Sequence, residues 1–458
     1  MYYAHSTVNP DKSDWQYLKT HLKNVADRSQ AFADDFHAGN LAYVSGLLHD
    51  IGKYSPEFQK RLAGARSPVD HSTAGAIEVT KIFQKDLEKI GFISAYIIAG
   101  HHGGLENFGS HVKGLCERLQ RTDIPDFSAY QSEIHPKPIT ALPFKFKSKR
   151  NSAGFCFSFF TRMLYSCLVD ADSLDTEQFC TPGKATLRTN YEPFAILAKK
   201  FEAHMQTIQS GTDDSLINRE RKKIFSQCIE AGSLPPGMFS LTVPTGGGKT
   251  LSSMGFALEH LKTHDLKRIF YVIPYTSIIE QNANIFRDIF GKRNVLEHHS
   301  NFDPESLKKS EEDPISESLK LSTENWDVPV IVTTTVQFFE SLFSNKRSRC
   351  RKLHNLAKSV IILDEAQMLP TKYLLPCLAA LAELVRNYGT SVVICTATQP
   401  KLEKIFMEHL DPKISIQEIM QSPGPDDLYK SLNRVHVTAL DHPIYDAELS
   451  SRDRKSVV

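Results

Sequence analysis

The 458-residue sequence lacks paired cysteines, an excess of charge of either sign, long apolar runs and internal repeats. Its eight cysteines are scattered without a Cys-x-x-Cys pair, which argues against a zinc ribbon and for reduced thiols. The net charge is only +1, so nucleic-acid binding would have to come from local basic patches. No apolar run reaches transmembrane length and the first residues carry no signal-peptide core. We therefore expect a cytoplasmic protein without a membrane partner.

The spacing of apolar residues differs between the two halves of the chain. Apolar residues recur at helical spacing in 18–26 and 40–48, whereas short β-rich runs alternate with helical segments after residue 237. Such alternation predicts a parallel sheet with helices on both faces. The expected strands are 238–243, 268–273, 328–333, 359–363 and 391–395. We predict a multidomain protein with an all-α domain at 1–180, a helical linker at 181–236, an α/β P-loop domain at 237–440 and an irregular tail at 441–458.

A glycine-rich turn between the first expected strand and a helical pattern has the features of a phosphate-binding loop. It reads Val243-Pro244-Thr245-Gly246-Gly247-Gly248-Lys249-Thr250. The glycines let backbone N–H groups surround phosphate oxygens, and Lys249 would reach the β- and γ-phosphates of ATP. The hydroxyl of Thr250 would bind Mg²⁺. The strict motif has glycine where Val243 stands, and the form with Pro-Thr-Gly resembles the loop of superfamily-two helicases.

A second apolar run, 359–363, ends in the acidic sequence Asp364-Glu365-Ala366-Gln367. This is typical of a Walker B element, in which Asp364 would bind Mg²⁺ through water and Glu365 would polarise the attacking water. We expect Gln367 to sense the γ-phosphate. After a phosphate-binding loop at this distance, the acidic pair indicates an ATPase.

The ends of other expected strands carry residues suited to hold a nucleic-acid backbone without reading its sequence. They are Pro274, Tyr275, Thr276, Thr333, Thr334, Thr396 and Thr398. In this order they resemble helicase motifs Ia and Ib and the element that couples nucleotide state to nucleic-acid binding. The basic run 346–352 is either a phosphate-binding strip or a solvated face.

Histidines and aspartates recur through the first 180 residues in a pattern that suits divalent metals. The candidate ligands are His21, His49, Asp50, His71, His101, His102, Asp172 and Asp170. Taken singly, each histidine is more commonly a core or surface residue. Together they are enough for two metal ions that share a bridging hydroxide, an arrangement that hydrolyses phosphodiesters. The last ligand stays open among Asp170, Asp172 and Asp175. Lys53 either contacts a phosphate or is solvated.

This histidine pattern resembles the HD superfamily of metal-dependent phosphohydrolases. More narrowly, Asp70-His71-Ser72-Thr73-Ala74-Gly75-Ala76 and His101-His102-Gly103 are similar to the HD nuclease of type I CRISPR systems. The family pattern favours Asp172 as the last ligand. The resemblance implies His49 and Asp50 at the catalytic centre and two ions from among Mn²⁺, Fe²⁺, Co²⁺ and Ni²⁺.

An HD nuclease ahead of a superfamily-two helicase domain with a RecA-like fold resembles the CRISPR-associated helicase-nucleases. That resemblance implies recruitment by the Cascade surveillance complex with its guide RNA. It also implies ATP-driven 3′-to-5′ translocation on the displaced non-target strand and cleavage of this single-stranded DNA. Only residues 399–458 follow the last motif, so we expect an N-terminal part without the second RecA-like domain and without unwinding of its own.

Two other functions stay open from the sequence. An HD nucleotide phosphohydrolase with a regulatory ATPase domain would cleave free nucleotides and leave single-stranded DNA intact. A non-catalytic nucleic-acid-binding module would do neither. The complete set of candidate ligands from His21 to Asp172 argues against the module, and the helicase-like strand ends argue against the phosphohydrolase.

Overall fold

The computed structural model describes residues 1–83, 88–109, 114–137, 139, 153–299, 314–397, 402–410, 413–422 and 424–432. The expected tail at 441–458 lies outside these described residues. Within them, no helix combines the length and apolar composition that spanning a bilayer requires.

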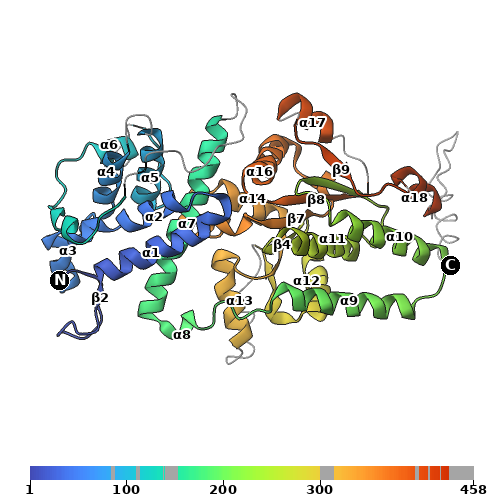
Figure 1. Cartoon of the computed structure of the whole chain (residues 1–458), viewed down its shortest axis with the longest axis horizontal. Coiled ribbons are helices and arrows are strands. Elements are labelled where there is room, and N and C mark those ends of the chain that lie inside the picture. Colours follow the sequence, from blue (N-terminus) through green and yellow to red (C-terminus); the bar gives the residue numbers. More distant parts are fainter. Residues whose placement is uncertain are drawn as a thin grey trace, which may run out of the picture.

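Helices make up the first part of the chain and gather at one end of the molecule (Figure 1). They are α1 (Leu18–Ala33), α2 (Gly39–Leu48), α3 (Pro56–Leu62), α4 (Ser72–Ile82), α5 (Glu88–Gly100), α6 (Leu115–Leu119) and α7 (Ala153–Cys180). A short antiparallel pair, β1 (Tyr3–His5) and β2 (Gln16–Tyr17), precedes α1. The long helix α7 runs between this helical group and the rest of the chain (Figure 1).

The second part of the chain is a seven-stranded sheet in the order β5-β6-β4-β7-β8-β3-β9, with every pair parallel. Its strands are β3 (Met238–Thr242), β4 (Arg268–Ile273), β5 (Val295–His298), β6 (Val330–Thr334), β7 (Ser359–Leu363), β8 (Ser391–Thr396) and β9 (Ile416–Glu418). Its helices are α11 (Lys249–His264), α12 (Thr276–Phe290), α13 (Pro314–Asn325), α14 (Thr335–Phe343), α15 (Arg347–Cys350), α16 (Leu374–Asn387), α17 (Leu402–His409) and α18 (Pro425–Ser431). The predicted fold class, helical domain first and parallel α/β domain second, is confirmed.

Strands β5 and β9 have no counterpart among the expected strands. β5 has only four residues and includes Glu297 and His298, and β9 has three residues at the sheet edge. Short strands with charged residues carry no β-rich run, so periodicity alone does not reveal them. The five expected strands correspond to β3, β4, β6, β7 and β8, and β4 and β7 have the expected bounds.

Helices α8 (Pro182–Ala185), α9 (Phe194–Gly211) and α10 (Leu216–Ala231) connect the two parts. Leu197 and Phe201 of α9 and Ile224 of α10 belong to the same buried apolar cluster as Leu241 of β3. Because these helices bury their apolar faces against the sheet side of the chain, we propose that α9 and α10 belong to the α/β domain. The linker is then short.

The opposite face of the sheet shares one apolar cluster with the helical domain. Phe36 and Phe159 both place their rings against Tyr388, with centroids 5.3 and 5.5 Å away. Cys156 of α7 donates to the Glu383 carboxylate at 3.0 Å. The two domains are therefore packed through a continuous core, and the orientation of α7 relative to the sheet is fixed by that packing.

Candidate metal and nucleotide sites

The candidate metal ligands, which are far apart in sequence, converge at the junction of five helices. His21 lies on α1, His49 directly follows α2, His71 precedes α4, and His101 follows α5. Asp172 lies on α7, whose inner face is buried along most of its length. Helix ends supply most of the ligands, so the helical scaffold holds these side chains in place without a long loop.

The converging side chains form two groups, each with ligand atoms within 4.8 Å of one another. One group holds Asp50, His71, His101 and His102, and the other holds His21, His49 and Asp172. Asp50 lies between them: its Oδ1 is 3.4 Å from His71 Nε2 and 3.2 Å from His101 Nε2. Its Oδ2 is 3.4 Å from His49 Nε2 and 3.7 Å from His21 Nε2. Each oxygen of one carboxylate thus faces one group.

The ring nitrogens are arranged as metal ligation requires. Three Nδ1 atoms lie 2.7 Å from acceptors behind the rings, namely Asp175 Oδ2 for His21, Gly46 O for His49 and Ile98 O for His101. Such bonds place the proton on Nδ1 and leave the Nε2 lone pair directed inward. Among the described residues, the Nε2 atoms of all three rings and Oδ1 of Asp50 are buried without a hydrogen-bond partner. The donor set therefore fits divalent ions of the first transition row.

Two glycines permit the close approach that assembles this cluster. A Cβ atom on Gly52 would lie 2.2 Å from the carbonyl oxygen of His71, and one on Gly75 would lie 2.1 Å from that of Leu48. Both distances are shorter than any normal contact. Gly52 therefore lets the segment after Asp50 lie against His71, and Gly75 lets α4 lie against the end of α2.

The charges of the cluster favour an ionised Asp50. Burial opposes its ionisation, but Lys53, His49 and His71 outweigh burial and hold the pKa of Asp50 well below its ordinary value. Lys53 is itself buried, with its Nζ 2.7 Å from Asp50 Oδ2. The alternative that Lys53 is solvated is therefore wrong: its ammonium group lies against Asp50, and its contact with a phosphate stays a prediction.

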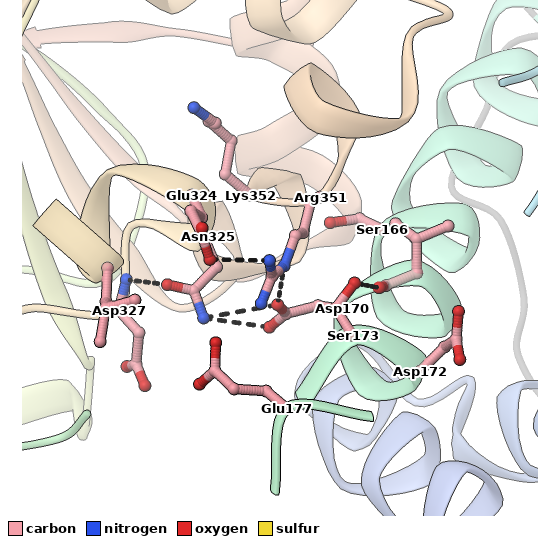
Figure 2. Close-up of polar contacts among 12 residues, drawn as sticks. Ser166, Asp170, Asp172, Ser173, Glu177, Glu324, Asn325, Asp327, Arg351 and Lys352 are labelled. Atoms are coloured by element: carbon pink, nitrogen blue, oxygen red, sulfur yellow. Dashed lines mark hydrogen bonds and ion pairs between the residues drawn. The ribbon is translucent and has the colours of Figure 1, made fainter. Parts of the chain in front are cut away.

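The three aspartates of α7 have separate partners. Asp172 Oδ1 lies 3.7 Å from His21 Nε2 and 3.8 Å from His49 Nε2, whereas Asp175 accepts from His21 Nδ1 and orients that ring. Figure 2 shows Asp170 turned toward Arg351 and Asn325, and Asp172 lying away from them. Asp170 accepts from Arg351 Nε at 2.6 Å. Its inclusion among the metal ligands is thus corrected, because its carboxylate faces the α/β domain.

The phosphate-binding loop follows β3 and borders a cavity of about 540 Å³. Thr245, Gly246, Gly248, Lys249 and Thr250 line it, together with Pro274, Asp364 and Glu365 at the ends of β4 and β7. Gly246 and Gly248 have φ angles of 82° and 89°, which a residue with a Cβ atom adopts only with strain. A Cβ atom on Gly247 would lie 2.4 Å from Val243 Cγ1, so the valine that departs from the strict motif packs against the loop.

The acidic pair is connected to the loop and to the neighbouring strand by hydrogen bonds. Lys249 Nζ lies 2.9 Å from Glu365 Oε1, and Gln367 donates to Glu365 Oε2 at 2.5 Å. Thr396, at the end of β8, donates to Gln367 Oε1 at 3.0 Å. Burial raises the pKa of Asp364, whose carboxylate accepts from the Tyr271 hydroxyl at 3.0 Å. A continuous series of hydrogen bonds therefore connects Lys249, through Glu365 and Gln367, to Thr396.

Sequence reasoning missed Arg221 of α10. Its guanidinium donates twice to the carbonyl oxygen of Gly246, at 3.0 and 2.8 Å, and so holds the phosphate-binding loop from outside. Arg221 lies 25 residues before Gly246 in the mainly basic stretch 219–223. No local pattern distinguishes it from the solvated lysines beside it.

The residues expected to contact nucleic acid differ in their exposure to solvent. Tyr275 is 46% exposed and available to a ligand. Thr333 is fully buried and donates to His298 O at 2.7 Å, and Thr334 caps α14 by accepting from Gln337 N. The expectation that these two hydroxyls face a DNA backbone is therefore corrected. Thr398 and the side chain of Thr276 lie outside the described residues.

The basic run 346–352 divides into two parts: Lys346 and Ser348 are exposed, whereas the end of the run is buried. Arg351 and Lys352 are largely buried, and burial lowers the pKa of Lys352 to about 7. Lys352 donates to the Thr323 carbonyl, and Arg351 pairs with Asp170 and Glu324 (Figure 2). Two arginines of the run, Arg347 and Arg351, pair with aspartates of α7, whereas Lys352 contacts the α/β domain.

Comparison with known families gives a match in each part of the chain. A model of the HD domain matches residues 18–129, and a model of the DEAD/DEAH box helicase matches residues 220–405. The chain is 32% identical over 429 residues to the CRISPR-associated nuclease/helicase Cas3 of Haloferax volcanii, covering 78% of this chain and 45% of that protein.

Solved structures share the fold. The ATP complex of T. fusca Cas3 matches with a TM-score of 0.58 at 17% identity, over 86% of this chain and 49% of that one. A chain of a CRISPR RNA-guided surveillance complex described as pre-nicking matches with a TM-score of 0.51 at 17% identity, over 87% and 47%. The chain thus spans about half the length of the relatives it matches. With an HD domain ahead of a DEAD/DEAH box helicase domain, it belongs to the Cas3-type HD-helicases.

Proposed function

We propose that the HD domain hydrolyses phosphodiester bonds of single-stranded DNA with two divalent metal ions. The observation that carries this proposal is the position of Asp50, with one carboxylate oxygen toward each group of histidines. A carboxylate shared in this way suits a pair of ions about 3.5–4 Å apart. When bound, such ions supply an activated water and stabilise the negative charge of the transition state. Mn²⁺, Fe²⁺, Co²⁺ and Ni²⁺ all suit these ligands.

The chain's own residues would orient the ligands. Hydrogen bonds at Nδ1 fix the rings of His21, His49 and His101, and Lys53 fixes Asp50. His71 and His102 lie at the accessible side of the cluster, with their Nε2 atoms 2.7 Å apart. We propose that the scissile phosphate approaches from this side.

We further propose that the α/β domain binds ATP with Mg²⁺ through Lys249, Thr250 and Asp364 and forms the first half of a helicase motor. In a longer protein, this motor would move 3′-to-5′ along the displaced non-target strand. The matches to Cas3 and to a chain of a surveillance complex support recruitment by Cascade with its guide RNA. Exposed Tyr275, beside Pro274 at the end of β4, would contact the DNA backbone.

A substrate panel tests the nuclease proposal. The purified chain is incubated without ATP, in Mn²⁺ or Co²⁺, with circular single-stranded DNA, with circular duplex DNA and with free nucleotides. We expect the single-stranded circle to be opened, the duplex circle to stay intact and a chelator to stop the reaction. Opening a circle requires an internal cut, so the assay excludes a contaminating exonuclease. Hydrolysis of free nucleotides beside an intact single-stranded circle would instead identify a nucleotide phosphohydrolase.

A further inference from the structure

A residue of the helicase domain reaches into the HD site. Arg347, the first residue of α15, directs its Nη2 toward Asp172 Oδ2 at 3.2 Å and toward Ser173 Oγ at 2.7 Å. Its Nε donates to the carbonyl oxygen of His101 at 2.8 Å. One guanidinium therefore contacts a residue from each of the two ligand groups, Asp172 of one and His101 of the other.

The contact on Asp172 determines which way its carboxylate faces. Arg347 engages Oδ2, while Oδ1 lies toward His21 and His49. Without a partner on Oδ2, the carboxylate could rotate about its terminal bond, since such sp³–sp² torsions are broad. The planar fork of arginine suits this task, because it donates in two fixed directions at once.

Neighbouring contacts hold Arg347 in place. One turn further along the chain, Arg351 pairs with Asp170, and Asn325 donates to the same carboxylate (Figure 2). On the other side, Leu105 N donates to Asn345 O at 2.9 Å. A Cβ atom on Gly104 would lie 2.6 Å from that oxygen, so only glycine permits this approach. Segment 345–351 thus touches both α7 and the turn that follows His101 and His102.

We propose that Arg347 is a positioning residue of the HD metal site, through which the helicase domain sets the geometry of the two-metal centre. The inference rests on the proposed function, because it takes Asp172 as a metal ligand. It assigns a role in the HD domain to Arg347, which lies 175 positions after Asp172 in the sequence. The helicase domain would thereby influence metal loading directly, without ATP.

The test is Mn²⁺ binding to the full chain, measured by calorimetry and by electron paramagnetic resonance. Outer-shell partners of metal ligands typically contribute about 10- to 100-fold to affinity, so in Arg347→Ala we expect one of two Mn²⁺ ions to bind at least about tenfold more weakly. The spectrum of a coupled Mn²⁺ pair should give way to that of an isolated ion. Arg349→Ala is the matched control, since Arg349 pairs with Glu340 inside the helicase domain.

Arg347→Lys serves as a second variant. Its single ammonium group cannot reach all three acceptors, so we expect Mn²⁺ affinity between those of the wild type and Arg347→Ala. If Arg347→Ala does not fold, Arg347→Lys becomes the test. Wild-type Mn²⁺ affinity in Arg347→Lys would then overturn the inference. A coupled pair retained in Arg347→Ala, or an equal loss in Arg349→Ala, would also overturn it while leaving the nuclease proposal standing. A wild-type chain that binds no Mn²⁺ would overturn both.

Discussion

Asp50→Asn is expected to remove Mn²⁺ binding at both positions and DNA cleavage with it. The substitution keeps the shape of the side chain but takes away the charge that faces both groups of histidines. Loss of an outer-shell partner costs about 10- to 100-fold in metal affinity or activity, and a shared ligand should cost more. Calorimetry with Mn²⁺ and the rate of opening of circular single-stranded DNA measure the two effects.

Asp123→Asn is the control for this experiment. Asp123 lies in the same domain, is exposed and pairs only with Arg121 among the ion pairs of the described residues. We expect wild-type metal binding and cleavage from it. Circular dichroism of both variants shows whether the helical domain stays folded. Wild-type cleavage by folded Asp50→Asn would show that the cluster is not the nuclease site.

Lys249→Ala is expected to weaken ATP binding by about 10- to 100-fold, because a hydrogen bond to a charged group contributes about 1.5–3 kcal/mol. Lys249 now pairs with Glu365, and we expect the nucleotide to replace that partner with its phosphates. Any ATP hydrolysis by the chain should be lost in parallel. A fluorescent ATP analogue gives the affinity, and released phosphate gives the rate.

Lys262→Ala provides the comparison. Lys262 lies on the same helix, α11, but is 72% exposed at the side chain and pairs with Glu259. We expect it to bind ATP as the wild type does. Lys249→Ala should still open circular single-stranded DNA without ATP, because the HD ligands lie in the other domain. Equal ATP affinity in wild type and Lys249→Ala would contradict the assignment of the phosphate-binding loop.

The fold class and most of the metal cluster were predictable because local patterns carry them. A glycine turn between a strand and a helix, and acids after an apolar run, are short-range features. Histidine and aspartate can be recognised in the sequence as possible metal ligands by their residue type. The resemblance to a known family then indicated that these residues belong to one metal site. The structure brings His21, His49, Asp50, His71, His101, His102 and Asp172 together.

What the sequence could not provide depends on which side of an element faces which partner. Asp170 and Asp172 are two residues apart, which is about 200° around a helix, so they point to nearly opposite sides. The local sequence does not indicate which of the two aspartates faces the histidines and which faces Arg351. The basic run 346–352 and Arg221 pose the same problem, since their partners are distant in sequence. Thr333 was misassigned because a strand-end hydroxyl has the same sequence appearance whether it is buried or exposed.

The central claim is that one bridging carboxylate and two groups of histidines hold a pair of metal ions. Anomalous diffraction at the manganese edge, from crystals of the chain grown with Mn²⁺, tests it most directly. We predict two peaks about 3.5–4 Å apart. One should lie beside His71 and His101 and the other beside His21, His49 and Asp172, with Asp50 between them. A cluster that holds no manganese under saturating Mn²⁺, with peaks only at exposed carboxylates elsewhere, would contradict the account.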